Sequence, residues 1–278
     1  GKQVIFISNN NIFAIDVSTQ KEKQLTKDGS NKIFNGHLDW VYQEELYGRG
    51  NFRGYWVSPD SKKIAFLRLD NSNVPVFSIV DHIPVHSHIE SNFYPKAGDP
   101  NPVVSLGIID IETSQIIWAE HSTYKDSSIL ITRVSWTPDS QNVVYQVQNR
   151  EQTWLDLNLA NYQTGNIRNI FRETSAHWIE VIDNPIWLSD GTFLWLSEQS
   201  GWKHVYHYNI DGKLINMVTN GDWEVREIYG VDEKNSCLYY SSTEHSHIGL
   251  QTYSIRLDSS DKKRLTQKEG TNISNFSP

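Results

Sequence analysis

The sequence has little cysteine, no long apolar run and no excess of positive charge. Cys237 is the only cysteine among the 278 residues, so a scaffold held by internal disulfides is excluded. No run approaches the roughly 18 apolar residues of a membrane helix, and the apolar run at residues 4–6 is too short for a signal peptide. We therefore expect a soluble chain without a membrane span, from which any targeting segment has been removed.

Acidic residues outnumber basic ones. The 33 Asp and Glu residues against 25 Lys and Arg give a formal net charge of −8. A nucleic-acid-binding surface needs a basic footprint, because its cations must displace the counterions of the phosphates. Nucleic acid is therefore not expected as a partner.

Strand-forming residues are abundant. The chain has 10 Trp, 13 Tyr and 10 Phe, together with many Val, Ile and Thr, and all of these favour strands. Short apolar or alternating runs recur between clusters of Asn, Asp, Gly and Ser, whereas helical spacing is hard to find over any window of about 12 residues. The sequence predicts an all-β fold.

Two kinds of hairpin alternate along the chain. The first is an aromatic residue, a turn and a strand, at residues 56–66, 136–145, 187–195 and 231–240, with a truncated copy at 275–278. The second contributes strands at residues 11–16, 106–110, 154–157, 205–209 and 250–254. Two hairpins make one four-stranded blade, and the last three spacings between first-kind hairpins, 52, 42 and 46 residues, match the length of a propeller blade. The prediction is a β-propeller slice of about five blades plus fragments. A two-sheet sandwich, the alternative, does not predict two alternating hairpins.

One spacing, of 79 residues, is longer than the others. It holds about 30 extra residues relative to a blade of ordinary length, mainly at residues 80–102, where Pro84, Pro95, Pro100 and Pro102 interrupt any central strand. The sequence therefore predicts an insertion arm that projects from one blade. Because the chain begins and ends inside the hairpin pattern, we expect residues 1–278 to be a propeller truncated at both ends.

Three motifs carry a resemblance to a known family. They are DWVYQEE at residues 39–45, YPKAG at 94–98 and GDWEV at 221–225. Together with the repeats, which span essentially the whole chain, they resemble the propeller domain of dipeptidyl peptidase IV-type enzymes in the prolyl oligopeptidase family. The resemblance implies an eight-bladed propeller over an α/β-hydrolase domain, and a serine peptidase that removes Xaa-Pro or Xaa-Ala dipeptides from peptide N-termini. It implies no cofactor. Bacterial members are often located in the periplasm or cell envelope, and the lack of paired cysteines favours a bacterial source.

The nucleophile of such an enzyme is not encoded in this chain. An α/β-hydrolase needs Gly-x-Ser-x-Gly at a strand-to-helix turn, and the only glycines four apart, Gly50 and Gly54, enclose no serine. We expect this chain alone to be inactive and its partner to be a C-terminal hydrolase domain of the same polypeptide. The alternative is a stand-alone propeller that binds a protein or carbohydrate without catalysis, and a hydrolase motif beyond Pro278 would decide between them.

Glu44 and Glu45 are the candidate substrate-binding residues. A free N-terminus presents three N–H donors and one positive charge, which two carboxylates can bind by charge-assisted hydrogen bonds. By match with the family motif, Glu44 and Glu45 form this pair, while Gln43 replaces a third Glu of several relatives. Without the motif, the same residues would be an exposed acidic pair on a short helix capped by Asp39.

Two further features follow from the resemblance. Residues 175–183, with Trp178, Ile179 and Glu180, match a loop that lines the substrate pocket in relatives, although the loop is shorter here and lacks their Phe-Arg pair. The arm at residues 80–94 leaves apolar side chains uncovered, and in relatives it helps to pair two subunits, so a homodimer is expected.

The histidines at residues 82, 86 and 88 lack suitably spaced Cys or carboxylate partners, so no metal site is expected.

Overall fold

The computed structural model describes residues 2–124 and 128–276. It divides into two compact units, Gly1–Trp178 and Ile179–Pro278, and each is treated by itself. Both are built from antiparallel strands, with only short helical segments in the described part of the chain. None of these segments is long and apolar enough to span a membrane.

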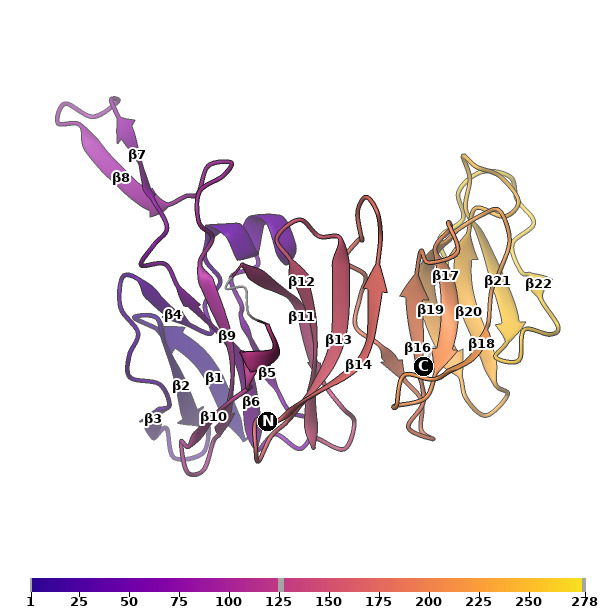
Figure 1. Cartoon of the computed structure of the whole chain (residues 1–278), viewed down its shortest axis with the longest axis horizontal. Helices are drawn as coiled ribbons and strands as arrows, with labels where there is room; N and C mark the ends of the chain where they lie inside the picture. Colours follow the sequence, from indigo (N-terminus) through magenta and orange to yellow (C-terminus); the bar gives the residue numbers. More distant parts are fainter. Residues whose placement is uncertain (1, 125–127, 277–278) are drawn as a thin grey trace. The chain divides into compact units, whose positions relative to one another are not determined.

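The first unit contains three blade-like sheets that follow one another in chain order (Figure 1). The first sheet comprises β1 (Gln3–Ser8), β2 (Asn11–Asp16) and β3 (Glu22–Gln24). The second has the order β10 (Ile116–Trp118), β9 (Val103–Asp110), β6 (Lys63–Asp70) and β4 (Ile33–Asn35), and β5 (Tyr55–Val57) also pairs with β6. The third comprises β11 (Ile129–Trp136), β12 (Asn142–Asn149), β13 (Trp154–Asn161) and β14 (Ile167–Thr174). A short 3₁₀ turn, η2 (His121–Thr123), lies between the second and third sheets in the chain.

The second unit contains two four-stranded sheets. One comprises β15 (Ile186–Trp187), β16 (Phe193–Ser197), β17 (His204–Tyr208) and β18 (Leu214–Met217), and the other β19 (Val225–Asp232), β20 (Cys237–Ser242), β21 (Gln251–Arg256) and β22 (Lys263–Arg264). In each, consecutive strands are neighbours. This strand order is that of a propeller blade, and it confirms the predicted all-β class and the pairing of two hairpins per sheet.

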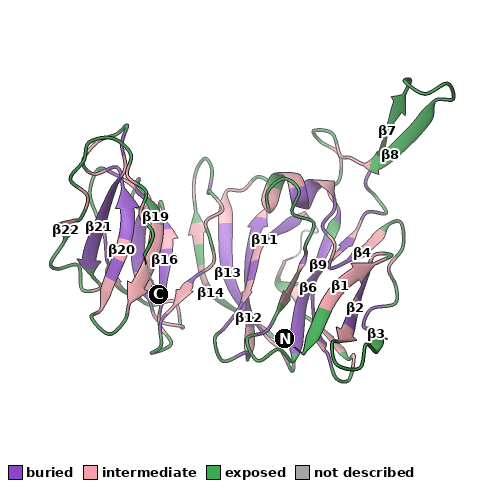
Figure 2. Ribbon diagram, turned by 180° about the vertical axis from the view of Figure 1, so that it is seen from behind, coloured by how far each residue is buried: buried purple, intermediate pink, exposed green. Residues whose placement is uncertain are grey.

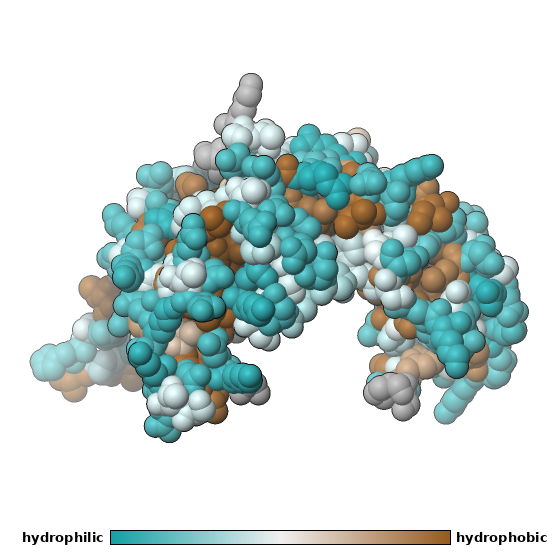
Figure 3. Space-filling model, turned by 90° about the horizontal axis from the view of Figure 1, so that it is seen from below, coloured by the Kyte–Doolittle hydropathy of each residue, from teal (hydrophilic) through white to brown (hydrophobic). Residues whose placement is uncertain are grey.

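Within each unit, the cores lie between consecutive sheets. The central strands β6, β12 and β13 are buried along nearly their whole length (Figure 2). The main core of the first unit joins side chains of the second and third sheets, including Leu67, Leu106 and Tyr145. The face of the chain seen in Figure 3 is mostly hydrophilic, with apolar side chains in separate patches.

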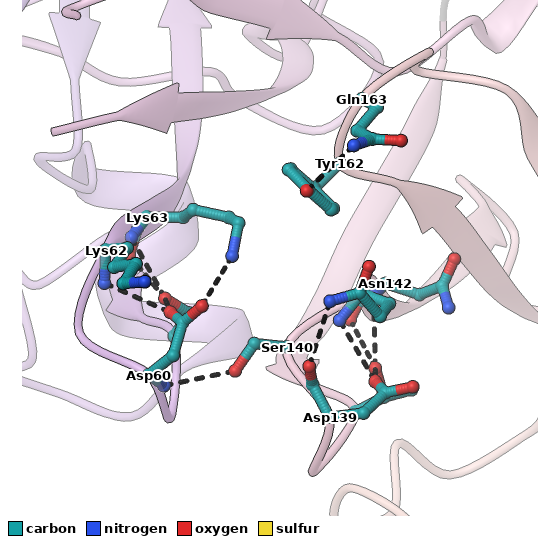
Figure 4. Close-up of polar contacts among 11 residues, drawn as sticks. Asp60, Lys62, Lys63, Asp139, Ser140, Asn142, Tyr162 and Gln163 are labelled. Atoms are coloured by element: carbon teal, nitrogen blue, oxygen red, sulfur yellow. Dashed lines mark hydrogen bonds and ion pairs between the residues drawn. The ribbon is translucent and has the colours of Figure 1, made fainter. Parts of the chain in front are cut away.

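The predicted Pro-Asp-Ser turns also connect neighbouring sheets. The Ser140 hydroxyl in the β11–β12 turn accepts the backbone N–H of Asp60 in the β5–β6 turn at 3.1 Å (Figure 4). The buried Lys63 Nζ lies 2.7 Å from Asp60 Oδ2 and 4.3 Å from the centroid of the Tyr162 ring. The ion pair lies within the second sheet. Because Tyr162 follows β13, the cation–π contact links this lysine of the second sheet to the third sheet.

An exposed hairpin lies between β6 and β9. It consists of β7 (Val76–Asp81) and β8 (His88–Phe93), pairs with no other sheet, and overlaps the predicted insertion. Figures 1 and 2 show it projecting from the sheets of its unit, with almost all of its residues exposed. We refer to β7, β8 and their connecting loop as the arm.

Candidate functional site

The motif that contains Glu44 and Glu45 interrupts the first strand of a blade. β4 and β5 pair with opposite halves of β6, and the chain between them leaves the sheet and returns. At the exit, Gly36 N–H donates to the Leu67 carbonyl at 2.8 Å, and on return Gly54 N–H donates to the Gly36 carbonyl at 2.9 Å. Gly36 has φ +68°, a conformation that favours glycine, and a Cβ on Gly54 would lie 2.8 Å from the Leu38 side chain, which would have to move. The site is therefore a closed loop on a blade strand.

The loop contains one short helical segment, which begins at Trp40 and continues as the π-helix η1 (Tyr42–Leu46). Asp39 Oδ1 accepts the N–H of Tyr42 at 3.1 Å, which confirms the predicted cap. The N–H of Tyr47 donates to the Tyr42 carbonyl at 2.9 Å, a five-residue spacing typical of a π-turn. The Gln43 side chain then accepts the N–H of Gly50 at 2.8 Å and folds the following residues back onto the helix. Gln43 is thus a structural residue of the loop.

The segment is held against strand β11. Tyr42 is fully buried in the core between the second and third sheets, and its hydroxyl accepts the N–H of Ile131 at 3.3 Å. The Tyr47 hydroxyl donates to the Ile131 carbonyl at 3.2 Å, and Arg133 Nη1 donates to the Leu46 carbonyl at 2.8 Å. Burial raises the pKa of Tyr42, so its hydroxyl stays protonated. These contacts fix the backbone on which the two glutamates are placed.

Glu44 and Glu45 occupy different environments. The Glu44 side chain is only 18% exposed, and both of its carboxylate oxygens are bound by Arg49, with Nε at 2.7 and 3.0 Å and Nη2 at 2.5 Å. Hydrogen bonding from Arg49 lowers the pKa of Glu44. Glu45 is exposed and has no hydrogen bond or ion pair with the described residues. The site therefore offers one ionised, guanidinium-bound carboxylate beside one that faces solvent.

Sequence reasoning did not predict a role for Arg49. It follows Glu44 by five residues and lies in the turn that follows η1. A charge pair at this spacing, flanked by Gly48 and Gly50, is the signal that could have indicated the contact.

Asp39 differs from Glu44 and Glu45 in being buried. Its Oδ2 atom has no hydrogen-bond partner among the described residues. Burial raises the pKa of this carboxyl to about 6, although backbone N–H groups, among them that of Tyr42, act in the opposite direction. Asp39 is thus a helix cap whose charge changes near neutral pH.

The second predicted loop lies where the chain passes from one unit to the other. Trp178 ends the first unit and Ile179 begins the second. Trp178 and Glu180 are exposed, whereas Ile179 is buried. Their role in a substrate pocket stays a prediction. His82, His86 and His88 lie in the arm, and the described ranges contain no group of three or more metal-ligating side chains.

The blade-like sheets and the inserted acidic helix define the class of the molecule, a β-propeller region with a polar site on one blade. The chain belongs to the dipeptidyl peptidase IV N-terminal region family, whose model matches residues 1–278. This match confirms the resemblance inferred from the sequence motifs.

Individual relatives give the same result. The chain is 30% identical over 294 residues to "Probable dipeptidyl-aminopeptidase B" of Phaeosphaeria nodorum, covering 96% of this chain and 32% of that protein. It is 28% identical over 270 residues to "Dipeptidyl peptidase 4" of Trichophyton tonsurans, covering 92% and 34%. The crystal structure of Porphyromonas gingivalis dipeptidyl peptidase 4 matches with a TM-score of 0.89 and 28% identity, over 100% of this chain and 39% of the other. The chain thus spans about a third of the length of its relatives.

Proposed function

We propose that this propeller region binds the substrate of a serine dipeptidyl peptidase, which releases Xaa-Pro or Xaa-Ala dipeptides from free peptide N-termini. In this proposal the parent polypeptide also contains an α/β-hydrolase domain, which supplies the nucleophile. The propeller gates access to that domain and binds the α-ammonium group of the substrate through Glu44 and Glu45.

The exposed carboxylate of Glu45 is the observation that carries the proposal. It has no cation partner among the described residues, and it lies next to a second ionised carboxylate on a segment fixed to β11. An ammonium group has three donors and no acceptor, so it needs several acceptors at one place. Glu45 offers both of its oxygens, and the Glu44 carboxylate retains acceptor capacity beyond its bonds to Arg49.

A fixed ammonium site also explains dipeptide release. If the N-terminus is bound at a constant distance from the nucleophile, only the bond after the second residue reaches the reacting position. The short loop with its two closing glycines and its contacts to Ile131 and Arg133 favours such a constant position. The preference for releasing dipeptides then depends on the rigidity of the segment that carries Glu44 and Glu45 as well as on the charge of these two residues.

The first prediction is that Glu45→Gln in the parent enzyme lowers kcat/KM on a free-amine Xaa-Pro substrate by about 10- to 150-fold. Gln keeps the shape and removes the charge, and a hydrogen bond to a charged group contributes roughly 1.5–3 kcal/mol. Steady-state kinetics with a chromogenic leaving group measures the effect. Glu45 gives a sharper test than Glu44, whose replacement would also release Arg49.

Glu22→Gln is the matched control, because it removes the same charge from an exposed position on β3. It should leave kcat/KM unchanged. A substrate with an acetylated N-terminus should have a low kcat/KM with the wild-type enzyme. Glu45→Gln should not lower this kcat/KM further, because the acetylated substrate has no ammonium group to bind. If Glu45→Gln retains wild-type kcat/KM on the free amine, Glu45 is a solvated surface residue and the proposed site is wrong.

We also propose that the arm pairs two copies of the parent enzyme. Seven large apolar side chains of the arm are exposed in the described structure: Val76, Phe77, Ile79, Val80, Ile83, Val85 and Ile89. An isolated two-stranded hairpin is marginally stable in water, and exposed apolar side chains gathered on one projecting element are typical of an interaction site. Contact between the same surfaces of two subunits is the simplest closed arrangement.

A further inference from the structure

The turn at residues 48–51 positions Arg49 next to Glu44. Gly48 and Gly50 flank it with φ values of +95° and +83°, a conformation that favours glycine. Gln43 fixes the turn from one side by accepting the Gly50 N–H at 2.8 Å, and the Asn51 N–H donates to the Gly48 carbonyl at 3.0 Å. The backbone that carries Arg49 is therefore positioned by hydrogen bonds that do not involve its side chain.

The guanidinium group is bound at one side and open at the other. Its Nε and Nη2 atoms contact Glu44, yet the Arg49 side chain is 85% exposed. A guanidinium has five N–H donors in a planar fork, and the described residues engage only those directed at Glu44. The remaining donors face solvent.

The charges of Glu44, Glu45 and Arg49 sum to −1. One α-ammonium group neutralises this charge. When the N-terminal side chain of the substrate is uncharged, the three protein side chains and the bound substrate N-terminus therefore have no net charge. The side chain of the N-terminal residue branches from the same Cα atom that carries the ammonium group. It therefore lies within reach of groups next to the ammonium ligands, and Arg49 is such a group.

We propose that Arg49 is a specificity-determining residue for the side chain of the N-terminal residue of the substrate. It favours an acidic side chain, which the open donors of the fork can bind, and it disfavours a basic side chain by like-charge repulsion. This inference rests on the proposed binding of the substrate ammonium by Glu44 and Glu45.

The test compares three substrates in the parent enzyme, Glu-Pro, Gln-Pro and Lys-Pro, each with the same chromogenic leaving group. Gln-Pro is the uncharged reference, so ratios of kcat/KM remove effects common to all three. In Arg49→Gln the Glu/Gln ratio should fall and the Lys/Gln ratio should rise, each about two- to fivefold, as expected for an exposed charge pair. Arg49→Lys should keep the wild-type Lys/Gln ratio, because the charge remains, and should lose part of the Glu/Gln preference with the planar fork.

Arg53→Gln is the matched control. Arg53 lies four residues further along the same loop, its side chain is exposed, and the substitution removes the same charge. It should leave both ratios at their wild-type values. Unchanged ratios in Arg49→Gln overturn the inference, and so does an equal rise for all three substrates, which would make Arg49 only a competitor of the ammonium group.

The same assay separates this inference from the proposed function. Glu45→Gln should lower kcat/KM for all three substrates. If it does not, the ammonium site is wrong. If it does, while Arg49→Gln leaves the ratios unchanged, the ammonium site stands and the role of Arg49 is wrong.

Discussion

Two carboxyl groups of the first unit, on the exposed Asp60 and the buried Asp39, have pKa values shifted in opposite directions. Partial desolvation raises the pKa of Asp60, but hydrogen bonds from Lys63, Ser58 and the Lys62 N–H outweigh it and lower the value to about 2. Its contribution to stability is therefore present above the unfolded value of 3.8 and is lost as the pH falls through 2. Asp39 has an oxygen without a partner among the described residues, so burial dominates and raises its pKa to about 6.

For Asp39 the linkage predicts a loss of stability as the pH rises. A carboxyl whose pKa is higher in the folded state contributes stability below the unfolded value of 3.8, and this contribution disappears as the pH rises through about 6. Asn keeps the cap but cannot ionise. Relative to Asp39→Asn, the wild-type chain should therefore lose up to roughly 3 kcal/mol of unfolding free energy between pH 4 and pH 7. Urea unfolding of both chains across this range measures the difference, and parallel stability curves would contradict it.

At the scale of single elements, local patterns were predictable and long-range contacts were not. The Pro-Asp-Ser turns, strand β2 and the Asp39 cap depend on neighbouring residues, and the sequence predicted them. The division of one strand into β4 and β5 was not predicted, because it requires both segments to pair with β6. The π-helix was missed for a similar reason, since the Tyr42, Tyr47 and Leu46 contacts come from β11, more than 80 residues away.

The arm and the helical segment are joined by aromatic side chains. Tyr94, which follows β8, lies 4.3 Å from Trp40 and 5.7 Å from Phe77 of β7, measured between ring centroids. Such pairs contribute roughly 0.5–1.5 kcal/mol each. We therefore expect Tyr94→Ala to accelerate amide hydrogen exchange about two- to tenfold both at the base of the arm and in residues 40–46.

Tyr94→Phe keeps the ring contacts and should exchange like the wild type. Hydrogen exchange followed by mass spectrometry resolves the two segments. If Tyr94→Ala accelerates exchange only in the arm, the two elements are independent, and the aromatic contacts do not stabilise the segment that carries Glu44 and Glu45.

At the scale of the whole molecule, the repeat pattern predicted the blades because each hairpin is a local unit with its own turn. The proposed ammonium site could be predicted only in part. Glu44 and Glu45 were found through a motif, whereas Arg49 depends on the turn that Gly48, Gly50 and Gln43 build. Sequence reasoning therefore identified Glu44 and Glu45 but not Arg49, which binds only Glu44 and so gives the two carboxylates different environments.

Assembly through the arm gives the last prediction. Ile83 and Val85 in the loop of the arm are 96% and 98% exposed. Burying two such side chains in a pair of contacting arms stabilises a dimer by roughly 1.5–3 kcal/mol for each side chain. Ile83→Ser combined with Val85→Ser should therefore shift the parent enzyme from dimer to monomer mass in light scattering. Ile248→Ser is the control, because Ile248 is 95% exposed in the second unit and outside the arm, and this variant should remain dimeric. A wild-type monomer, or a dimer that survives the double substitution, would show that these side chains do not pair the subunits.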